Sequence, residues 1–250
     1  MFDKTDYQSI FNQRADSYHK AMLTWPVARD EEFLAIIEDL DFFDGIKIVD
    51  IPAGGGYLTN YLPDNVQLHH LETSELFAEL CHSGSTNPLD ICTLDNLPIE
   101  DGSVDAVVSL AGLHHTENKI DLFREIYRSL KSGGKVLLAD AEENSFTAKF
   151  LDGWMAQHNS MGHNGWFFNK RTKEDLESLG FEVVKAANKN YYWNFSSKKE
   201  AAEYCKLMFG IDLAEVDAIE DALDKELGFV MQDGKACLKW QLHFIEAIKP

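Results

Sequence analysis

The feature that most constrains this 250-residue sequence is a regular alternation of short apolar runs with segments of helical periodicity. Apolar runs suited to strands occur at 46–51, 66–72, 89–92, 104–110 and 135–141. The run at 104–110 is almost continuously apolar, as expected for a central strand that is buried on both faces. The alternation therefore predicts an α/β fold in which helices cover both faces of a parallel sheet.

Composition and charge exclude several classes of protein. The chain is 45% hydrophobic and 26% charged, and 42 acidic residues against 23 Lys and Arg give a formal net charge of −19. That charge repels phosphate backbones, so we expect no nucleic-acid substrate. No basic leader opens the chain, and no apolar stretch approaches the roughly 18 residues of a membrane span. We therefore expect a cytoplasmic protein without membrane insertion, whose partner is a small-molecule substrate.

The four cysteines, Cys81, Cys92, Cys205 and Cys237, lie far apart and form no CxxC pair. This spacing indicates reduced core thiols rather than a zinc site or a disulfide framework.

The composition changes after residue 142, where an aromatic-rich segment at 146–168 follows the fifth predicted strand. Further elements are expected: a helix at 172–179, a strand at 181–186, helices at 197–209 and 213–227, and a final strand at 237–247. We interpret the chain as a single domain over 1–250. Its three parts are an N-terminal helical lid at 1–42, a cofactor-binding core at 43–142, and a substrate cover with C-terminal strands at 143–250.

A glycine turn follows the first predicted strand, at Pro52-Ala53-Gly54-Gly55-Gly56. Such a turn lets a ligand approach the backbone, and the next helix offers free N–H groups. Glu72 ends the second strand 18 positions after Gly54, where a carboxylate can accept both ribose hydroxyls. The alternative is a plain tight turn, with Glu72 capping the next helix. Thr59 replaces the third glycine of the dinucleotide fingerprint, which disfavours a nicotinamide enzyme and favours an adenosine ligand without pyrophosphate, such as S-adenosylmethionine.

Five segments, at 48–59, 71–74, 97–105, 113–115 and 123–134, follow one another at characteristic spacings. They resemble the motifs of class I S-adenosylmethionine-dependent methyltransferases, in the small-molecule branch that includes the ubiquinone and menaquinone biosynthesis enzymes. The resemblance implies a doubly wound, Rossmann-like, seven-stranded and mostly parallel sheet in the order 3-2-1-4-5-7-6 with an α-helical lid. It also implies S-adenosyl-L-methionine as cofactor and S-adenosyl-L-homocysteine as product.

The resemblance further implies which residues contact the cofactor. The backbone of the glycine turn would pass the methionine part, Glu72 would hold the ribose, and other residues would border the adenine or lie under the sulfonium. The residues expected at these places, besides Glu72, are Ala53, Gly54, Gly56, Thr73, Thr93, Leu94, Leu110 and Ala111. Asp50 is expected to orient the turn rather than to touch the ligand.

The segment 11–18 resembles the helix that closes over the cofactor in this branch. Tyr18 is the contact expected from it, with Arg14 or Arg29 pairing with the cofactor carboxylate.

Two residues depart from the family pattern. Pro52 replaces the usual first glycine and removes one N–H group. Thr93 stands where an aspartate usually accepts from the adenine amino group. Either Asp95 or a backbone carbonyl must take that role, or the adenine is held by packing alone.

Methyl transfer from a sulfonium is an in-line displacement, so the protein mainly aligns the reactants and excludes water; alignment contributes up to roughly 7–11 kcal/mol. A base is needed only when the nucleophile must lose a proton. His114 and His115 follow the fourth strand and are the candidates for that base. The alternative is that one caps the next helix and the other packs beneath it.

The aromatic cover supplies the candidate acceptor pocket, with Trp154, His158, His163, Trp166 and Trp193 as its expected lining. The alternative is that these side chains form the private core of the cover. The spacing of His158, His163 and Glu142 fits no metal-site pattern, so no metal is expected.

The resulting hypothesis is S-adenosylmethionine-dependent methyl transfer to a small aromatic or apolar metabolite. Thr93 and the lack of a clear base leave an alternative, a catalytically silent S-adenosylmethionine-binding regulatory protein.

Overall fold

A computed structural model describes residues 7–84 and 86–250. Eight strands form one sheet in the order β3-β2-β1-β4-β5-β8-β6, with β7 paired to β8. The bounds of the strands are β1 Lys47–Asp50, β2 Gln67–Glu72, β3 Leu89–Ile91, β4 Val104–Leu110, β5 Leu130–Asp140, β6 Glu182–Phe195, β7 Phe229–Gln232 and β8 Lys235–Ile248.

This topology confirms the predicted doubly wound sheet. The first five strands are parallel, and β8 runs antiparallel between β5 and β6. The additional strand β7, which was not predicted, forms a hairpin with β8. Strand 7 of the predicted order therefore corresponds to β8. Asp233 and Gly234 both have positive φ at the turn between them. An Asp-Gly turn between apolar runs is a sequence signal for such a hairpin.

Helices cover both faces of the sheet, as expected. Their bounds are α1 Tyr7–Thr24, α2 Asp30–Ile37, α3 Glu75–Gly84, α4 Ile120–Ser129, α5 Phe146–Phe150, α6 Lys170–Ser178, α7 Lys198–Phe209 and α8 Val216–Glu226. Shorter turns are the 3₁₀ helices η1 Tyr57–Tyr61 and η2 Leu113–His115 and the π-helical turn η3 Leu151–Met155.

Three sequence-based boundaries were wrong. The helix expected directly after the glycine turn is only the 3₁₀ turn η1. Strand β5 begins at Leu130 instead of 135, because Leu130 pairs with Val104 and the residues up to Lys135 form a bulge. Strand β6 extends to Phe195 instead of ending at 186, because β8 pairs with it along its whole length.

The core lies in two layers on either side of the sheet. Val107 and Val108 are adjacent on β4 and fully buried, yet they belong to different hydrophobic clusters. This confirms that the central strand is covered on both faces. No helix in the described part of the chain is long and apolar enough to cross a membrane, and the cytoplasmic location stays a prediction.

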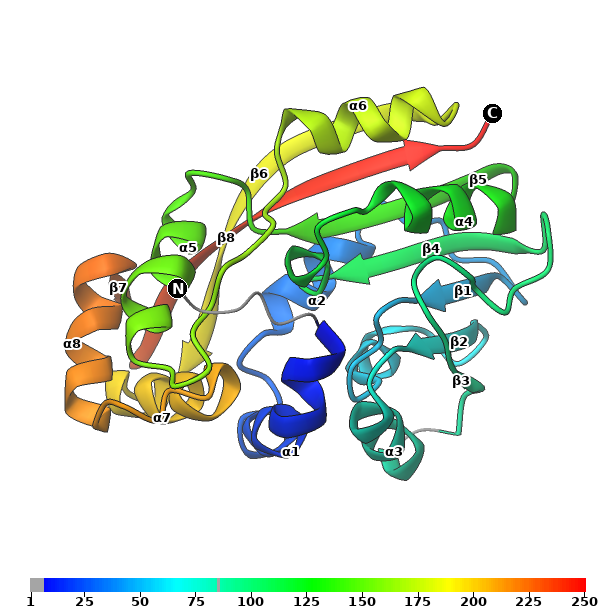
Figure 1. Ribbon diagram of the computed structural model, residues 1–250. Coiled ribbons are helices and arrows are strands. Elements are labelled where there is room, and N and C mark those ends of the chain that lie inside the picture. The colour runs from blue at the N-terminus through cyan, green and yellow to red at the C-terminus, as the bar shows by residue number, and fades with distance from the viewer. Residues whose placement is uncertain (1–6, 85) are drawn as a thin grey trace.

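The carboxyl ends of β1, β4 and β5 point toward a region bounded by α1, α5 and α7 (Figure 1). Helix α1 packs against both α3 and α7 and so bridges the two halves of this edge. It lies within the predicted lid at 1–42, of which the first six residues fall outside the described part. Ligand sites of open α/β sheets lie at this edge.

Candidate functional site

Glu72 and the glycine turn form one hydrogen-bonded unit. The N–H of Gly54 donates to Glu72 Oε2 at 2.6 Å. The N–H groups of Thr73 and Ser74 donate to Oε1 at 2.7 and 2.8 Å, and the Tyr7 hydroxyl donates to Oε2 at 3.2 Å. The Glu72 side chain is fully buried, and burial raises its pKa to about 7. The carboxylate thus holds the turn and the chain leading into α3 together.

The glycines of the turn have different roles. Gly54 has a φ of +55°, and a Cβ there would meet only the Tyr57 ring, at 3.9 Å. Gly56 has a φ of +74°, and a Cβ there would lie 2.6 Å from Cys81 Sγ. Gly54 therefore leaves room on the cavity side of the turn, whereas Gly56 leaves room for the packing of α3.

Asp50 supports the turn from below. Its Oδ2 pairs with His70 Nδ1 at 3.1 Å, and His70 Nε2 lies 3.0 Å from Thr59 Oγ1. Both Asp50 and His70 are buried, and burial raises the pKa of Asp50. This chain of contacts joins β1, β2 and η1 beneath the turn.

A cavity lies between this turn, α1 and the end of β4. Its lining includes six of the residues expected to contact the cofactor: Tyr18, Arg29, Ala53, Gly54, Leu110 and Ala111. Asp50, which was expected only to orient the turn, also lines it. Gly56 lies behind the wall of this cavity rather than on it.

A neighbouring groove of about 550 Å³ is lined by the three residues expected around the adenine, Thr73, Thr93 and Leu94. Thr73 Oγ1 is buried and has no hydrogen-bond partner within the described residues. Sequence reasoning missed two residues here. Tyr7 lines both the groove and the cavity, and Asn96 rather than Asp95 lies on the groove.

A second cavity, of about 70 Å³, meets the first one over Ala111, Tyr18 and Arg29, which line both. His114, His115, His163 and Trp193 line this second cavity, together with Arg14. We call it the acceptor cavity.

Three residues expected in the acceptor pocket lie elsewhere. Trp154 and His158 stack on each other with ring centroids 4.0 Å apart, and neither lines the acceptor cavity. Trp166 lines a separate groove beside α4 and α6. The alternative that these side chains serve the packing of the cover fits the Trp154–His158 pair.

Arg29 and Arg14 both line the acceptor cavity but differ in their hydrogen-bond and ion-pair partners. Arg29 pairs with the buried Glu32 and donates to the Tyr18 hydroxyl at 2.5 Å. Glu32 also accepts from Trp193 Nε1 at 2.7 Å. Arg29 is therefore neutralised within the protein.

Arg14 donates to the Met208 carbonyl at 3.3 Å, and its buried Nε has no hydrogen-bond partner among the described residues. A Cβ on Gly210 would lie 2.4 Å from that Nε, so α7 needs a glycine at its end to admit the guanidinium. Burial lowers the pKa of Arg14 to about 10. Arg14 is thus a buried cation placed to receive an anionic group.

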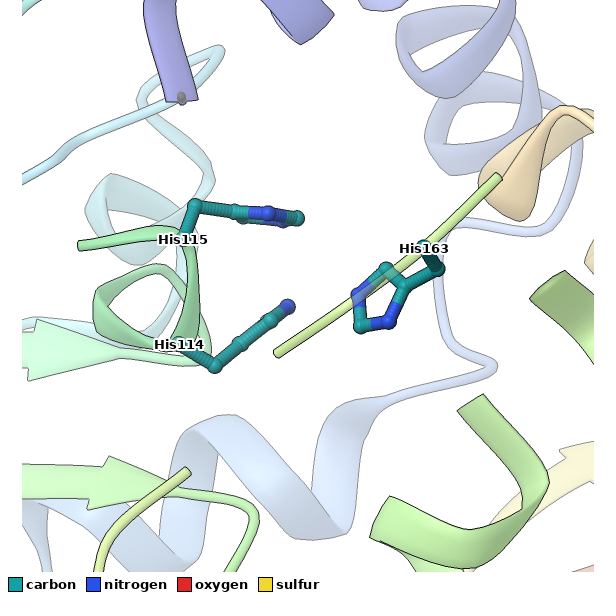
Figure 2. Close-up of side chains that lie close together, drawn as sticks. All are labelled: His114, His115 and His163. Atoms are coloured by element: carbon teal, nitrogen blue, oxygen red, sulfur yellow. The ribbon is translucent and has the colours of Figure 1, made fainter. Parts of the chain in front are cut away.

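Three histidines gather at the edge of the acceptor cavity (Figure 2). His114 and His115 belong to η2, and His163 lies in the segment after η3. His114 Nδ1 lies 2.7 Å from Asp140 Oδ1, and His163 Nδ1 lies 2.6 Å from Asp152 Oδ1. Burial lowers the pKa of His163 and, more strongly, that of His115, so both imidazoles are neutral near pH 7.

Sequence reasoning missed both aspartates. Asp140 ends β5 at the same sheet edge as η2, which is a signal that could have found it. Asp152 lies in a helical turn of the cover, and no sequence pattern connects it to His163. His158, His163 and Glu142, the set considered from the sequence, are not brought together, since Glu142 pairs with His243 and bonds to Asn188.

Comparison with known proteins finds similarity to methyltransferases. Residues 49–138 match the family described as "Methyltransferase domain". Arsenite methyltransferase of Halobacterium salinarum is 30% identical over 171 residues, which are 63% of this chain and 42% of that protein. A tRNA (carboxymethyluridine(34)-5-O)-methyltransferase of Macaca fascicularis is 30% identical over 127 residues, 47% of this chain and 18% of that protein. This chain thus spans less than half the length of these relatives.

Solved structures show the same fold. A S-adenosylmethionine-dependent methyltransferase of Thermotoga maritima superposes with a TM-score of 0.65 at 18% identity, covering 98% of this chain and 100% of that one. Phosphoethanolamine N-methyltransferase 2 of Haemonchus contortus, in complex with S-adenosyl-L-methionine, gives 0.63 at 17% identity, covering 98% and 60%. S-adenosylmethionine is the methyl donor typical of the matched domain, and S-adenosylhomocysteine is its product.

Proposed function

We propose that the chain, which carries a methyltransferase domain at 49–138, transfers a methyl group from S-adenosylmethionine to a small molecule held in the acceptor cavity. One observation carries the proposal: the cavity of the glycine turn and the acceptor cavity meet over Ala111, Tyr18 and Arg29. A methyl donor in the first cavity and an acceptor in the second would therefore lie next to each other.

The residues around the first cavity fit this cofactor. Glu72 would accept the ribose hydroxyls in place of the Tyr7 hydroxyl, whose 3.2 Å contact is the longest at that carboxylate. The unpartnered Thr73 Oγ1 and the Asn96 amide border the groove proposed for the adenine. The Asn96 side-chain carbonyl would accept from the adenine amino group in place of the usual aspartate carboxylate.

The acceptor cavity favours a small aromatic or apolar molecule that carries an anionic group. Trp193, Trp240 and Phe209 supply stacked aromatic walls, and Arg14 supplies the cation. Arsenite and phosphoethanolamine, the acceptors in the names of two relatives, are also small, although neither is aromatic. The net charge of −19 opposes a tRNA acceptor.

The sulfonium supplies an activated leaving group when the cofactor is bound, so the protein residues mainly orient the acceptor. His114 is held by Asp140 at two points, through Nδ1 at 2.7 Å and through its backbone N–H at 2.9 Å. This pairing orients the other ring nitrogen, which is the atom that would take a proton from the acceptor. The base role of His114 or His115 thus stays a prediction.

Calorimetric titration with S-adenosylmethionine, followed by a screen with the isotope-labelled donor, tests the proposal. The screen covers phenols, thiols, aromatic carboxylates, amines, quinone precursors, arsenite and phosphoethanolamine, and quinone precursors test the predicted branch. We expect saturable binding and label transfer to at least one class. Binding without any transfer would favour the regulatory alternative. Heat on titration with NAD but not with S-adenosylmethionine would contradict the cofactor assignment.

A pair of glycine variants localises the cofactor. Gly54→Leu fills the cavity side of the turn and should abolish binding. Gly102→Leu is the control and should leave binding unchanged, because Gly102 has a similar φ, +59°, and a Cβ there would meet nothing within 4 Å. Equal binding by both variants would place the cofactor elsewhere.

A further inference from the structure

We infer that His114, His115 and His163 bind one divalent transition-metal ion at the edge of the acceptor cavity. One ligand atom from each of the three rings lies within 4.8 Å of the other two. In a tetrahedral zinc site with Zn–N bonds of about 2.0–2.1 Å, ligand nitrogens are about 3.4 Å apart. A shift of about 1 Å in the rings would therefore close the site.

The ring packing agrees with this geometry. The centroids of His114 and His115 are 4.1 Å apart, and His163 lies 5.5 and 5.4 Å from them. All three rings are directed into one space between η2 and the facing segment of the cover (Figure 2). Stacked histidines that merely pack would not require their nitrogens to converge.

Two carboxylates hold the rings in the orientation that a metal site needs. Asp140 occupies His114 Nδ1 and Asp152 occupies His163 Nδ1, so each ring keeps Nε2 as its free nitrogen. Carboxylates that accept from the second nitrogen of a ligating histidine are the regular outer partners of metal sites, where they fix the tautomer and the ring orientation. Their negative charges also compensate the charge of a divalent cation.

The ligand set indicates which ions fit. Three imidazoles select zinc and similar transition metals over magnesium and calcium, which prefer oxygen ligands. Three protein ligands also leave a fourth position open, as in catalytic zinc sites. Here that position faces the acceptor cavity, because all three histidines line it together with Ala111 and Arg14.

The ion's role rests on the proposed function, whereas its binding does not. We assign the open position to an acidic oxygen or sulfur atom of the acceptor, such as a phenol or a thiol, which loses its proton to water on binding the cation. A lone pair of that atom then forms the bond to the methyl carbon, while the carbon–sulfur bond of the donor breaks and its electron pair stays on sulfur. With the cation bound, Nε2 of His114 is a metal ligand and no longer a base, so the cation would generate the nucleophile in place of the histidine base considered above.

The sequence-based expectation of no metal considered a different set of residues. His163 is 48 positions from His115, a separation that matches no short ligand motif, and only the fold brings the two together.

The test uses the full chain after treatment with a chelator, titrated with zinc chloride by calorimetry and with Co²⁺ by absorption. We expect one ion per chain and the visible bands of four-coordinate Co²⁺. His163→Ala should lower the zinc affinity at least about 100-fold. Asp152→Asn, which keeps all three ligands, should lower it roughly 10- to 100-fold.

Matched controls come from a His–Asp pair outside the cluster. His69 is paired with Asp90 at 2.9 Å, so His69→Ala and Asp90→Asn should leave zinc binding unchanged. Thermal unfolding of each variant identifies any loss due to misfolding. Absence of saturable heat in the unmodified chain, or full affinity in His163→Ala, would overturn the site.

Titration of the metal-depleted chain with S-adenosylmethionine separates the two proposals. Zinc binding without cofactor binding would contradict the proposed function and leave the metal site standing. Undiminished methyl transfer after metal removal would overturn the assigned role of the ion.

Discussion

Glu72 illustrates how a single residue combines structural and binding roles. Its carboxylate accepts three backbone N–H groups from the glycine turn and the start of α3, and it has no exposed surface. The sequence alternatives, a ribose ligand or a helix cap, are therefore not exclusive. The same burial raises its pKa to about 7, so its charge changes near neutral pH.

We expect the affinity for S-adenosylmethionine to rise with pH through about 7, because ribose hydroxyls donate best to the ionised carboxylate. Below that pH the affinity should fall by up to about tenfold per unit. Calorimetry across about pH 6 to 8 measures this slope. Glu72→Gln should weaken binding roughly tenfold or more and remove the slope; an unchanged slope in the variant would assign it to another group.

The free protein should respond to pH in the opposite direction. The folded carboxyl holds its proton to about pH 7, and the unfolded one only to about 4.5. The contribution of Glu72 to the free energy of unfolding is therefore full below 4.5 and is lost as the pH rises through 7.

Gly56→Ala should destabilise the protein more than Gly133→Ala. Both glycines have positive φ, +74° and +79°, so both variants carry a backbone cost of about 1–2 kcal/mol. Only the Cβ at 56 meets Cys81 Sγ, at 2.6 Å, which adds about 1–3 kcal/mol of overpacking. Urea unfolding measures the difference, and Cys81→Ala in the Gly56→Ala background should remove most of it.

At the scale of elements, the spacing of apolar residues predicted those strands and helices whose own sequence shows which positions are buried. The apolar spacing at 120–130 predicted α4, which spans Ile120–Ser129, and the run at 104–110 matches β4. The strand expected at 181–186 matches the start of β6, but the polar stretch at 187–190 carried no such signal. It is a strand because β8 pairs with it residue by residue, from Glu182 opposite Ile248 to Phe195 opposite Ala236.

Helix α1 should be a mobile cover that the cofactor orders. Its polar contacts with other elements are single hydrogen bonds: Ser17 Oγ donates to the Leu207 carbonyl at 2.7 Å, Ser74 Oγ donates to Asn12 Oδ1 at 2.9 Å, and His19 Nδ1 lies 2.8 Å from the Tyr57 hydroxyl. Arg14, Tyr7 and Tyr18 make the contacts described above. Its Phe11 and Tyr18 line the cavity of the glycine turn. Hydrogen exchange at 7–24 should therefore be faster than at β4 in the free protein and slow down when S-adenosylmethionine binds.

Ser17→Ala should speed exchange in α1 without affecting α4. Ser178→Ala, which removes a similar 2.8 Å bond within α6, serves as the control. If the exchange rate in α1 changes neither when the cofactor binds nor in the Ser17→Ala variant, the role of this helix as a cover is contradicted.

At the scale of the whole molecule, the net charge of −19 opposes compaction through mutual repulsion. Salt screens this repulsion over about 10 Å at 0.1 M. We expect the Tm to rise by a few degrees between about 20 and 300 mM NaCl. Sucrose at equal osmolality is the control for effects unrelated to charge. A Tm that falls with salt would mean that surface ion pairs outweigh the net repulsion.

The sequence by itself indicated the α/β class and the glycine turn with its acidic partner, because these depend on periodicity and on spacings of a few tens of residues, which a linear pattern records. Its resemblance to a known family implied the order of the sheet and the cofactor. Only the tertiary structure decided which aromatic residues face the acceptor cavity, that Arg14 lies there with its Nε unpartnered among the described residues, and that Asn96 borders the groove. It also decided that His163 meets His114 and His115, because that contact depends on how the cover folds back over the sheet edge.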